Sequence, residues 1–118
     1  MNVEHGTQIV DIDVSTLSEW MRRGEAILID VREREEFAEE RIPGAVPIPL
    51  SDFDPDTLPR SPGKRLVLSC FIGGRSYEAA ERTLAATDAE IFNLDGGLFA
   101  WKEAGLTTDT GQPRTNAA

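Results

Sequence analysis

Residues 65–76 read RLVLSCFIGGRS, and this stretch decides the fold class. Its first five residues include a short apolar run of the length expected for a buried β-strand. Small apolar side chains then recur at helical spacing, which predicts a helix from about Ser76 to Ala86. The only cysteine of the chain, Cys70, therefore falls where the strand gives way to the loop before the helix. Strand, short loop and helix form the repeating unit of parallel α/β sheets.

The same alternation continues on both sides of this unit. Strands are predicted over residues 9–12, 26–29, 65–69 and 90–94, with a short edge strand in the proline-rich stretch 42–50, and helices over about 14–24, 33–40, 76–86 and 98–104. The pattern predicts an α/β fold, a single domain over residues 9–106 with a central, mainly parallel sheet of about five strands flanked by helices. Residues 1–8 and 107–118 have no apolar periodicity and are predicted to be disordered.

Size and composition narrow the possible functions. The chain has 118 residues, enough for one domain, and a formal net charge of −9. That charge argues against binding to nucleic acid, which depends on Lys and Arg neutralising phosphates. No apolar run approaches the length of a membrane span. The first residues lack the features of a secretion signal, so the cytoplasm is the expected location.

A single cysteine limits the chemistry further. It excludes an intramolecular disulfide, a Cys-x-x-Cys redox pair and a multi-cysteine zinc site, and no metal is expected. The lone histidine, His5, lies in the predicted loose terminus, so a Cys–His dyad is not expected either. If Cys70 is a nucleophile, groups other than a histidine must activate it.

The loop after Cys70 supplies such groups. Gly73 and Gly74 let the backbone fold back so that successive N–H groups point inward and form an anion-binding nest. The following helix adds the positive end of its dipole, and Arg75 adds a permanent charge. These groups stabilise a thiolate, and they can also hold the terminal sulfur of a persulfide. The pattern predicts covalent catalysis in two displacements, with sulfur carried on Cys70 and no separate cofactor.

Four blocks of sequence carry a resemblance to a known family. They are residues 29–33 (IDVRE) with 36–37 (EF), residues 42–45 (IPGA), residues 70–76 (CFIGGRS), and residues 95–97 (DGG) with 100–101 (AW) and 104–105 (AG). In order and spacing they resemble the single-domain rhodanese family over about residues 9–106. The resemblance implies a central parallel sheet and sulfurtransferase activity through a persulfide on Cys70.

The resemblance also implies roles for neighbouring residues. Cys70 and Arg75 are the expected catalytic residues, and Phe71, Ile72, Gly73, Gly74 and Ser76 are expected to form or border the active-site loop. Asp30 and Arg32 match a block at the end of a neighbouring strand, where they are expected to help hold that loop. The expected partners are a small-molecule or protein sulfur donor and a thiol or cyanide acceptor, and the oligomeric state stays open.

The chain departs from the family pattern at two places. Arg41 stands where the family commonly has a histidine before the Ile-Pro-Gly-Ala block. Phe71 and Ile72 are apolar, whereas the position after the cysteine is often basic or polar. A loop mouth with less positive charge predicts poor use of dianionic donors such as thiosulfate and better use of organic or protein persulfides.

Structural interpretations of the same residues remain open at this point. Cys70 could be a buried core cysteine, and Arg75 could merely pair with a carboxylate. Asp30 and Arg32 could serve only the turn after their strand. Trp20 and Trp101 lie on apolar helix faces and are predicted to be core residues, while Gly96 and Gly97 are most simply turn glycines.

Two other functions use the same features. A phosphatase or arsenate reductase needs a loop that cups a tetrahedral oxyanion, and phosphatase loops of the Cys–Arg type have five residues between the two, whereas residues 71–74 number four here. A reductase of this kind also needs a second thiol, which the chain lacks. The other possibility is a rhodanese-like binding module without turnover, for which the apolar pair Phe71 and Ile72 would be a docking patch.

Overall fold

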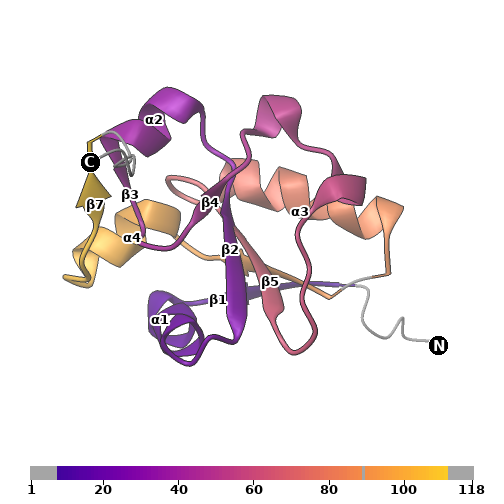
Figure 1. The fold of residues 1–118 in the computed structure, drawn as a ribbon, viewed down its shortest axis with the longest axis horizontal. Coiled ribbons are helices and arrows are strands. Elements are labelled where there is room, and N and C mark those ends of the chain that lie inside the picture. The colour runs from indigo at the N-terminus through magenta and orange to yellow at the C-terminus, as the bar shows by residue number, and fades with distance from the viewer. Residues whose placement is uncertain (1–7, 89, 112–118) are drawn as a thin grey trace, which may run out of the picture.

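A five-stranded, all-parallel sheet forms the centre of the computed structural model, which describes residues 8–88 and 90–111 (Figure 1). The strands run in the order β1-β6-β5-β2-β4 and comprise β1 (Ile9–Ile12), β2 (Ala26–Asp30), β4 (Val46–Pro47), β5 (Arg65–Ser69) and β6 (Ile91–Leu94). The predicted α/β architecture is therefore confirmed. Because all five strands are parallel, their carboxyl ends lie at one edge of the sheet, where ligand sites of such folds form.

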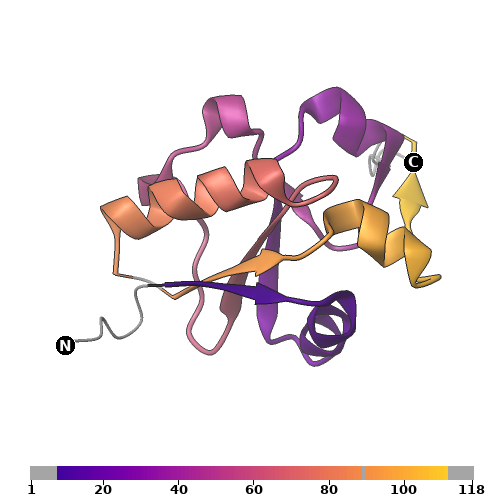
Figure 2. The same cartoon turned by 180° about the vertical axis from the view of Figure 1, so that it is seen from behind.

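Helices cover both faces of the sheet (Figures 1 and 2). One face packs against α1 (Val14–Arg22) and α4 (Gly97–Glu103), in a cluster that includes Leu17, Phe92 and Trp101. The other face packs against α3 (Gly74–Ala86) and the 3₁₀ turns η1 (Leu50–Asp52) and η2 (Pro55–Thr57). Trp20 packs edge-to-face on Phe92 with ring centroids 5.0 Å apart, so the prediction that both tryptophans belong to the core is confirmed.

Local sequence explains where the helices begin. Asp13 caps α1, because its carboxylate accepts a hydrogen bond from the Thr16 N–H at 2.8 Å. Helix α3 begins at Gly74, two residues before the predicted Ser76. The reason is Gly73, whose φ of 131° turns the chain so that its carbonyl already accepts the helical hydrogen bond from the Tyr77 N–H at 3.1 Å.

Prolines shorten the edge strand. Only Val46–Pro47 pairs with β2 as a strand, although the prediction extended the alternation to Leu50. Pro47 and Pro49 have no N–H to donate, but Ile48 and Leu50 donate theirs to the carbonyls of Asp30 and Val31, both at 2.9 Å. Residues 46–50 therefore lie at the edge of the sheet, as predicted, and the N–H groups of Ile48 and Leu50 are both hydrogen-bonded.

The C-terminal segment requires a correction. The sequence predicts a disordered tail that includes residues 107–111, but Asp109–Thr110 form β7. This strand pairs antiparallel with β3 (Glu40–Arg41), which follows directly after α2 (Arg34–Glu39). Arg41 fastens the pair by donating to the Gly111 carbonyl at 2.7 Å. Such a pairing joins residues about 70 positions apart and leaves no local apolar periodicity. The remaining residues of the two predicted tails, 1–7 and 112–118, lie outside the described part of the chain, while Gln8 is described.

Candidate active site

Cys70 lies directly after β5, at the carboxyl edge of the sheet and against the amino end of α3. Its thiol is buried, with 2% of the residue exposed. Two backbone groups donate to the Sγ atom, namely the Gly73 N–H at 3.1 Å and the Ser76 N–H at 3.4 Å. Both donors and the positive end of the α3 dipole favour negative charge on this sulfur. The loop thus folds back over Cys70 at Gly73, whereas Gly74 already belongs to α3 and the two donors are not on successive residues as the sequence predicts.

A polar chain behind the sulfur was not predicted from the sequence. The Ser76 hydroxyl lies 3.4 Å from Cys70 Sγ and 2.6 Å from Asn93 Oδ1, and the Asn93 amide donates to Asp11 at 3.0 Å. Asn93 is 4% exposed, inside β6 between two apolar residues. A buried asparagine in a central strand is itself a signal, since burying an amide is costly unless its hydrogen bonds are made.

Arg75 reaches a carboxylate rather than the sulfur. Its two terminal nitrogens donate to Glu36 of α2 at 2.7 and 3.1 Å, and each side chain is 38% exposed. Among the described residues, no hydrogen bond joins the Arg75 guanidinium to Cys70 Sγ. The hydrogen bonds from Arg75 are the main cause that lowers the pKa of Glu36, and the same pairing raises the pKa of Arg75. The carboxylate partner considered from sequence is therefore present.

Asp30 and Arg32 form a buried ion pair at the end of β2. Arg32 Nη2 lies 2.8 Å from Asp30 Oδ2, and each side chain is 4% exposed. The remaining guanidinium donors reach the carbonyl oxygens of Glu36 at 3.3 Å and Glu40 at 2.7 Å. The pair thus holds the end of α2 rather than the cysteine loop itself. Its connection to the loop runs through Glu36, which in turn holds Arg75.

Gly97 contacts the cysteine loop from the other side. A Cβ atom on this residue would lie 2.6 Å from the Phe71 carbonyl oxygen, and closer still to that of Cys70. The first turn of α4 also donates to these carbonyls, from the Leu98 N–H to Cys70 and from the Phe99 N–H to Phe71, both at 2.9 Å. Gly97 is therefore more than a turn residue: its missing side chain lets α4 lie directly on the loop.

Apolar side chains surround the mouth of the loop. Phe71, Ile72 and Phe99 are 38%, 64% and 50% exposed, and the two phenylalanine rings meet edge-to-face at 6.0 Å. A groove of about 420 Å³ adjoins them, lined by Phe71 and Leu98 together with Arg32 and three glutamates of the α2 region, Glu36, Glu39 and Glu40. Arg32, Glu36 and Glu40 are each in an ion pair, with Asp30, Arg75 and Lys102, so this surface combines apolar area with the negative charge of Glu39.

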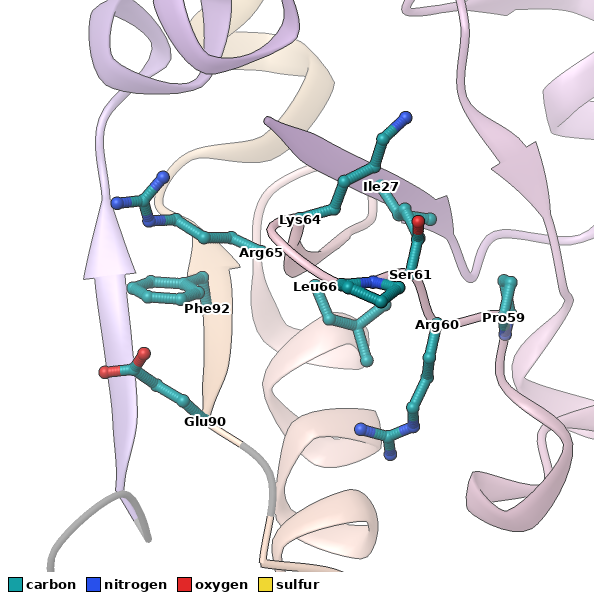
Figure 3. A pocket seen from close by; sticks show the side chains of 10 residues that line it. Ile27, Pro59, Arg60, Ser61, Lys64, Arg65, Leu66, Glu90 and Phe92 are labelled. Carbon is teal, nitrogen blue, oxygen red and sulfur yellow. The ribbon is translucent and has the colours of Figure 1, made fainter. Parts of the chain in front are cut away.

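A hollow of about 460 Å³ lies at the amino ends of the strands, opposite the Cys70 end of the sheet and near the first residue of β5 (Figure 3). Three cations line it, but Arg60, Lys64 and Arg65 point in different directions. Arg65 stacks on the Trp20 ring at 4.4 Å instead of turning inward. The hollow therefore does not assemble a charged site.

Within residues 8–88 and 90–111, no cluster of His, Cys, Asp or Glu could hold a metal ion, and no helix is long and apolar enough to cross a membrane. His5 lies outside these ranges.

Comparison with known families identifies the family to which this fold and site belong. Residues 13–104 match the rhodanese-like domain, and that range contains the cysteine loop, the Asp30–Arg32 pair and Gly97. The chain belongs to the rhodanese-like domain family. The family resemblance noted in the sequence is thereby confirmed, and Cys70 occupies the carboxyl edge of a rhodanese-like sheet.

Several relatives of this rhodanese-like domain carry the name of an activity. A sulfurtransferase of Allochromatium vinosum is 33% identical over 98 residues, covering 81% of this chain and 91% of that protein. The putative sulfurtransferase YtwF of Bacillus subtilis is 34% identical over 96 residues, covering 80% and 92%. The human single-domain sulfurtransferase superposes with a TM-score of 0.70 at 28% identity, covering 79% of this chain and 95% of that one.

Other relatives are longer than this chain. An uncharacterised protein of Synechocystis is 42% identical over 99 residues, and an HTH-type transcriptional regulator of Mycobacterium tuberculosis is 37% identical over 106 residues. The matches cover 84% and 86% of this chain but only 55% and 46% of those proteins, so the chain spans about half their length. The rhodanese-like domain thus also occurs within larger proteins.

Proposed function

We propose that this rhodanese-like domain is a sulfurtransferase that carries sulfur as a persulfide on Cys70. The observation that supports this most strongly is the position of Sγ, which lies at the carboxyl edge of the sheet and accepts hydrogen bonds from Gly73 and Ser76. Such donors stabilise an anionic sulfur without a histidine. A purely structural core cysteine would not need a loop that turns backbone N–H groups toward it.

The proposed reaction has two balanced displacements. In the first, the Cys70 thiolate attacks the outer sulfur of a donor R–S–SH; a new S–S bond forms, the donor S–S bond breaks, and R–S⁻ leaves with the electron pair. In the second, an acceptor thiolate attacks the outer sulfur of Cys70–S–SH and releases the Cys70 thiolate. No net oxidation occurs in either step, so no redox cofactor is required. The backbone donors stabilise the negative charge that alternates on the Cys70 sulfur atoms.

The apolar rim of the loop, formed by Phe71, Ile72 and Phe99, favours organic or protein persulfides as donors. Because Cys70 is almost completely buried, most of a donor must remain outside, on the surface formed by Phe71, Ile72 and Phe99. Binding of a donor's carbon atoms against that surface is favourable because it removes apolar area from water. A dianion gains little from the same contact. The loop cation, Arg75, is already paired with Glu36, and Glu39 adds a negative charge to the adjacent groove. These charges oppose the approach of thiosulfate.

The function is tested by the variant Cys70→Ser in an assay with an organic persulfide donor and cyanide as acceptor. The expected result is complete loss of transfer with an unchanged thermal unfolding temperature, because the change replaces one sulfur atom by oxygen. The chain contains no other thiol that could substitute. Transfer that persists in this variant would exclude the proposed mechanism.

The donor preference is tested by Phe71→Arg. A new cation within about 4 Å of a dianion is worth several kcal/mol at an effective dielectric near 20, so kcat/KM for thiosulfate should rise, and the gain should shrink as salt is added. The matched control is Ala86→Arg, which adds the same charge at the last residue of α3. Equal effects of the two variants would show that net charge, and not the loop, controls the use of thiosulfate.

The apolar rim also fits a binding module without turnover, which would dock a protein and leave Cys70 unmodified. A phosphatase is less consistent with the site, since Arg75 turns to Glu36 instead of into the loop, where an oxyanion would need it. Sulfur loading of Cys70 separates transfer from docking.

A further inference from the structure

We propose that Asn93, oriented by Asp11, is a positioning residue that determines whether the Ser76 hydroxyl accepts from or donates to the Cys70 sulfur. The proposal rests on the proposed function only in taking the Cys70 sulfur as the reacting atom. Neither Asn93 nor Asp11 is hydrogen-bonded to that atom, whose partners are Gly73 and Ser76; both act through Ser76.

The three residues form one continuous chain on the α3 face of the sheet. Asp11 of β1 and Asn93 of β6 are register partners in adjacent parallel strands, so their side chains lie on the same face. The Asn93 Nδ2 group donates to Asp11 Oδ1 at 3.0 Å, and Asn93 Oδ1 lies 2.6 Å from the Ser76 hydroxyl. Ser76 is fully buried, whereas Asp11 is exposed.

Chemistry determines the direction of each hydrogen bond. An ionised carboxylate only accepts, so the Asn93 amide must turn its NH₂ group toward Asp11 and its oxygen toward Ser76. That oxygen also only accepts, so Ser76 must donate its single hydroxyl proton to it, or to the Gly73 carbonyl at 3.2 Å. The hydroxyl lone pairs then remain for Cys70, 3.4 Å away, and the thiol donates to Ser76.

In this arrangement the Ser76 hydroxyl does not stabilise an anionic Cys70 sulfur, although the N–H groups of Gly73 and Ser76 still do. When the sulfur becomes a thiolate or an anionic persulfide, Ser76 can help only by withdrawing its proton from Asn93 and turning it toward the sulfur. Asn93 therefore competes with the anionic sulfur for one proton. The carboxylate of Asp11 strengthens that competition, since it prevents the amide from rotating and offering an N–H to Ser76.

The test measures the rate of Cys70 alkylation by iodoacetamide as a function of pH, comparing Asp11→Ala with Asp11→Asn. Both variants remove the acceptor-only carboxylate that fixes the Asn93 amide, because alanine has no polar group and asparagine can donate as well as accept. Asp11→Ala should lower the midpoint of the pH profile by about one pH unit, the size expected for one hydrogen bond to a charged sulfur. Asp11→Asn should lower it in the same direction, because its NH₂ group can donate to Asn93 Oδ1 and let the Asn93 amide offer an N–H to Ser76.

The second arm repeats both variants in a Ser76→Ala background. There both variants should shift the midpoint much less, because the hydroxyl that transmits the effect is gone and only the effect of the lost charge remains. The other charged groups around the site, namely Arg75 with Glu36 and Arg32 with Asp30, are the same in every variant. Their contribution therefore cancels in the comparison.

Two results would overturn the proposal. One is a wild-type midpoint for both variants when Ser76 is present, and the other is a shift of the same size when Ser76 is absent. A purely structural loosening of the loop would raise the maximal alkylation rate of Asp11→Ala without moving its midpoint. Alkylation reports on the thiol whether or not sulfur is transferred, so failure of the proposed function would appear separately, as absence of a persulfide.

Discussion

Replacing Gly97 by alanine should disrupt the cysteine loop more than any comparable glycine change in the chain. The new Cβ would lie 2.6 Å from the Phe71 carbonyl oxygen, about 1 Å short of an ordinary van der Waals contact. The obstructing atoms belong to the backbone, so no side-chain rotation can relieve the overlap. Either α4 or the loop must move, and both hydrogen bonds that join them would weaken.

The expected cost of Gly97→Ala has two parts. Gly97 has a φ of +54°, and holding alanine in the left-handed region costs about 1–2 kcal/mol. Weakening the two hydrogen bonds from α4 to the loop adds about 0.5–1.5 kcal/mol each. The sum is about 2–5 kcal/mol of the free energy of unfolding. Because the carbonyl of Cys70 itself is displaced, the alkylation rate of its thiol should change as well.

Gly105→Ala is the matched control. Gly105 follows the same helix and has a φ of +77°, but a Cβ there would have no neighbour within 4 Å. It should lose only the conformational part, about 1–2 kcal/mol, and leave the reactivity of Cys70 unchanged. Urea unfolding and iodoacetamide alkylation measure the two effects. If Gly97→Ala costs no more than Gly105→Ala, the close approach of α4 does not support the loop.

Three further predictions concern the ion pairs beside the loop. Arg32→Met leaves Asp30 buried without its partner, so the free energy of unfolding should fall by about 3–5 kcal/mol, and a loss below about 1 kcal/mol would contradict this role. In Glu36→Gln, stability should fall by only about 0.5 kcal/mol at neutral pH, since the pair with Arg75 is partly exposed. Because Arg75 lowers the folded pKa of Glu36 from 4.5, this difference should be present above about pH 4.5 and disappear as the pH falls through the folded pKa, which unfolding at several pH values would show. Arg75→Ala should slow alkylation of Cys70 up to about tenfold, because it removes a cation beside the reacting sulfur, and an unchanged rate would exclude an effect of its charge.

Much of the fold follows from local sequence. The apolar strands 65–69 and 26–29, the Asp13 cap and the proline-limited edge strand all lie where local patterns predict them. The pairing of β3 with β7 does not, because two-residue strands that meet across about 70 positions have no periodicity of their own. Their pairing is fixed by tertiary contacts such as those of Arg41.

The residues of the site also divide into those that local sequence predicts and those that only tertiary contacts bring together. A loop motif locates Cys70 and its backbone donors, because glycines and a following helix are local features. Partners on other elements cannot be found in this way: Glu36 lies 39 residues from Arg75, and Asp11 lies 82 residues from Asn93. Asn93 inside β6 and the glycine pair Gly96–Gly97 at the start of α4 are visible in the sequence. Only the packing shows that Asn93 bonds to Ser76 and that Gly97 lies against the cysteine loop.

The central claim is tested most directly by intact-protein and peptide mass spectrometry after exposure to an organic persulfide. The account predicts the added mass of one sulfur atom, located on the peptide that contains Cys70 and removed by cyanide or a thiol. The Cys70→Ser variant should gain no such mass. A wild-type protein that gains no sulfur from organic or protein persulfides would contradict the account and identify the fold as a docking module.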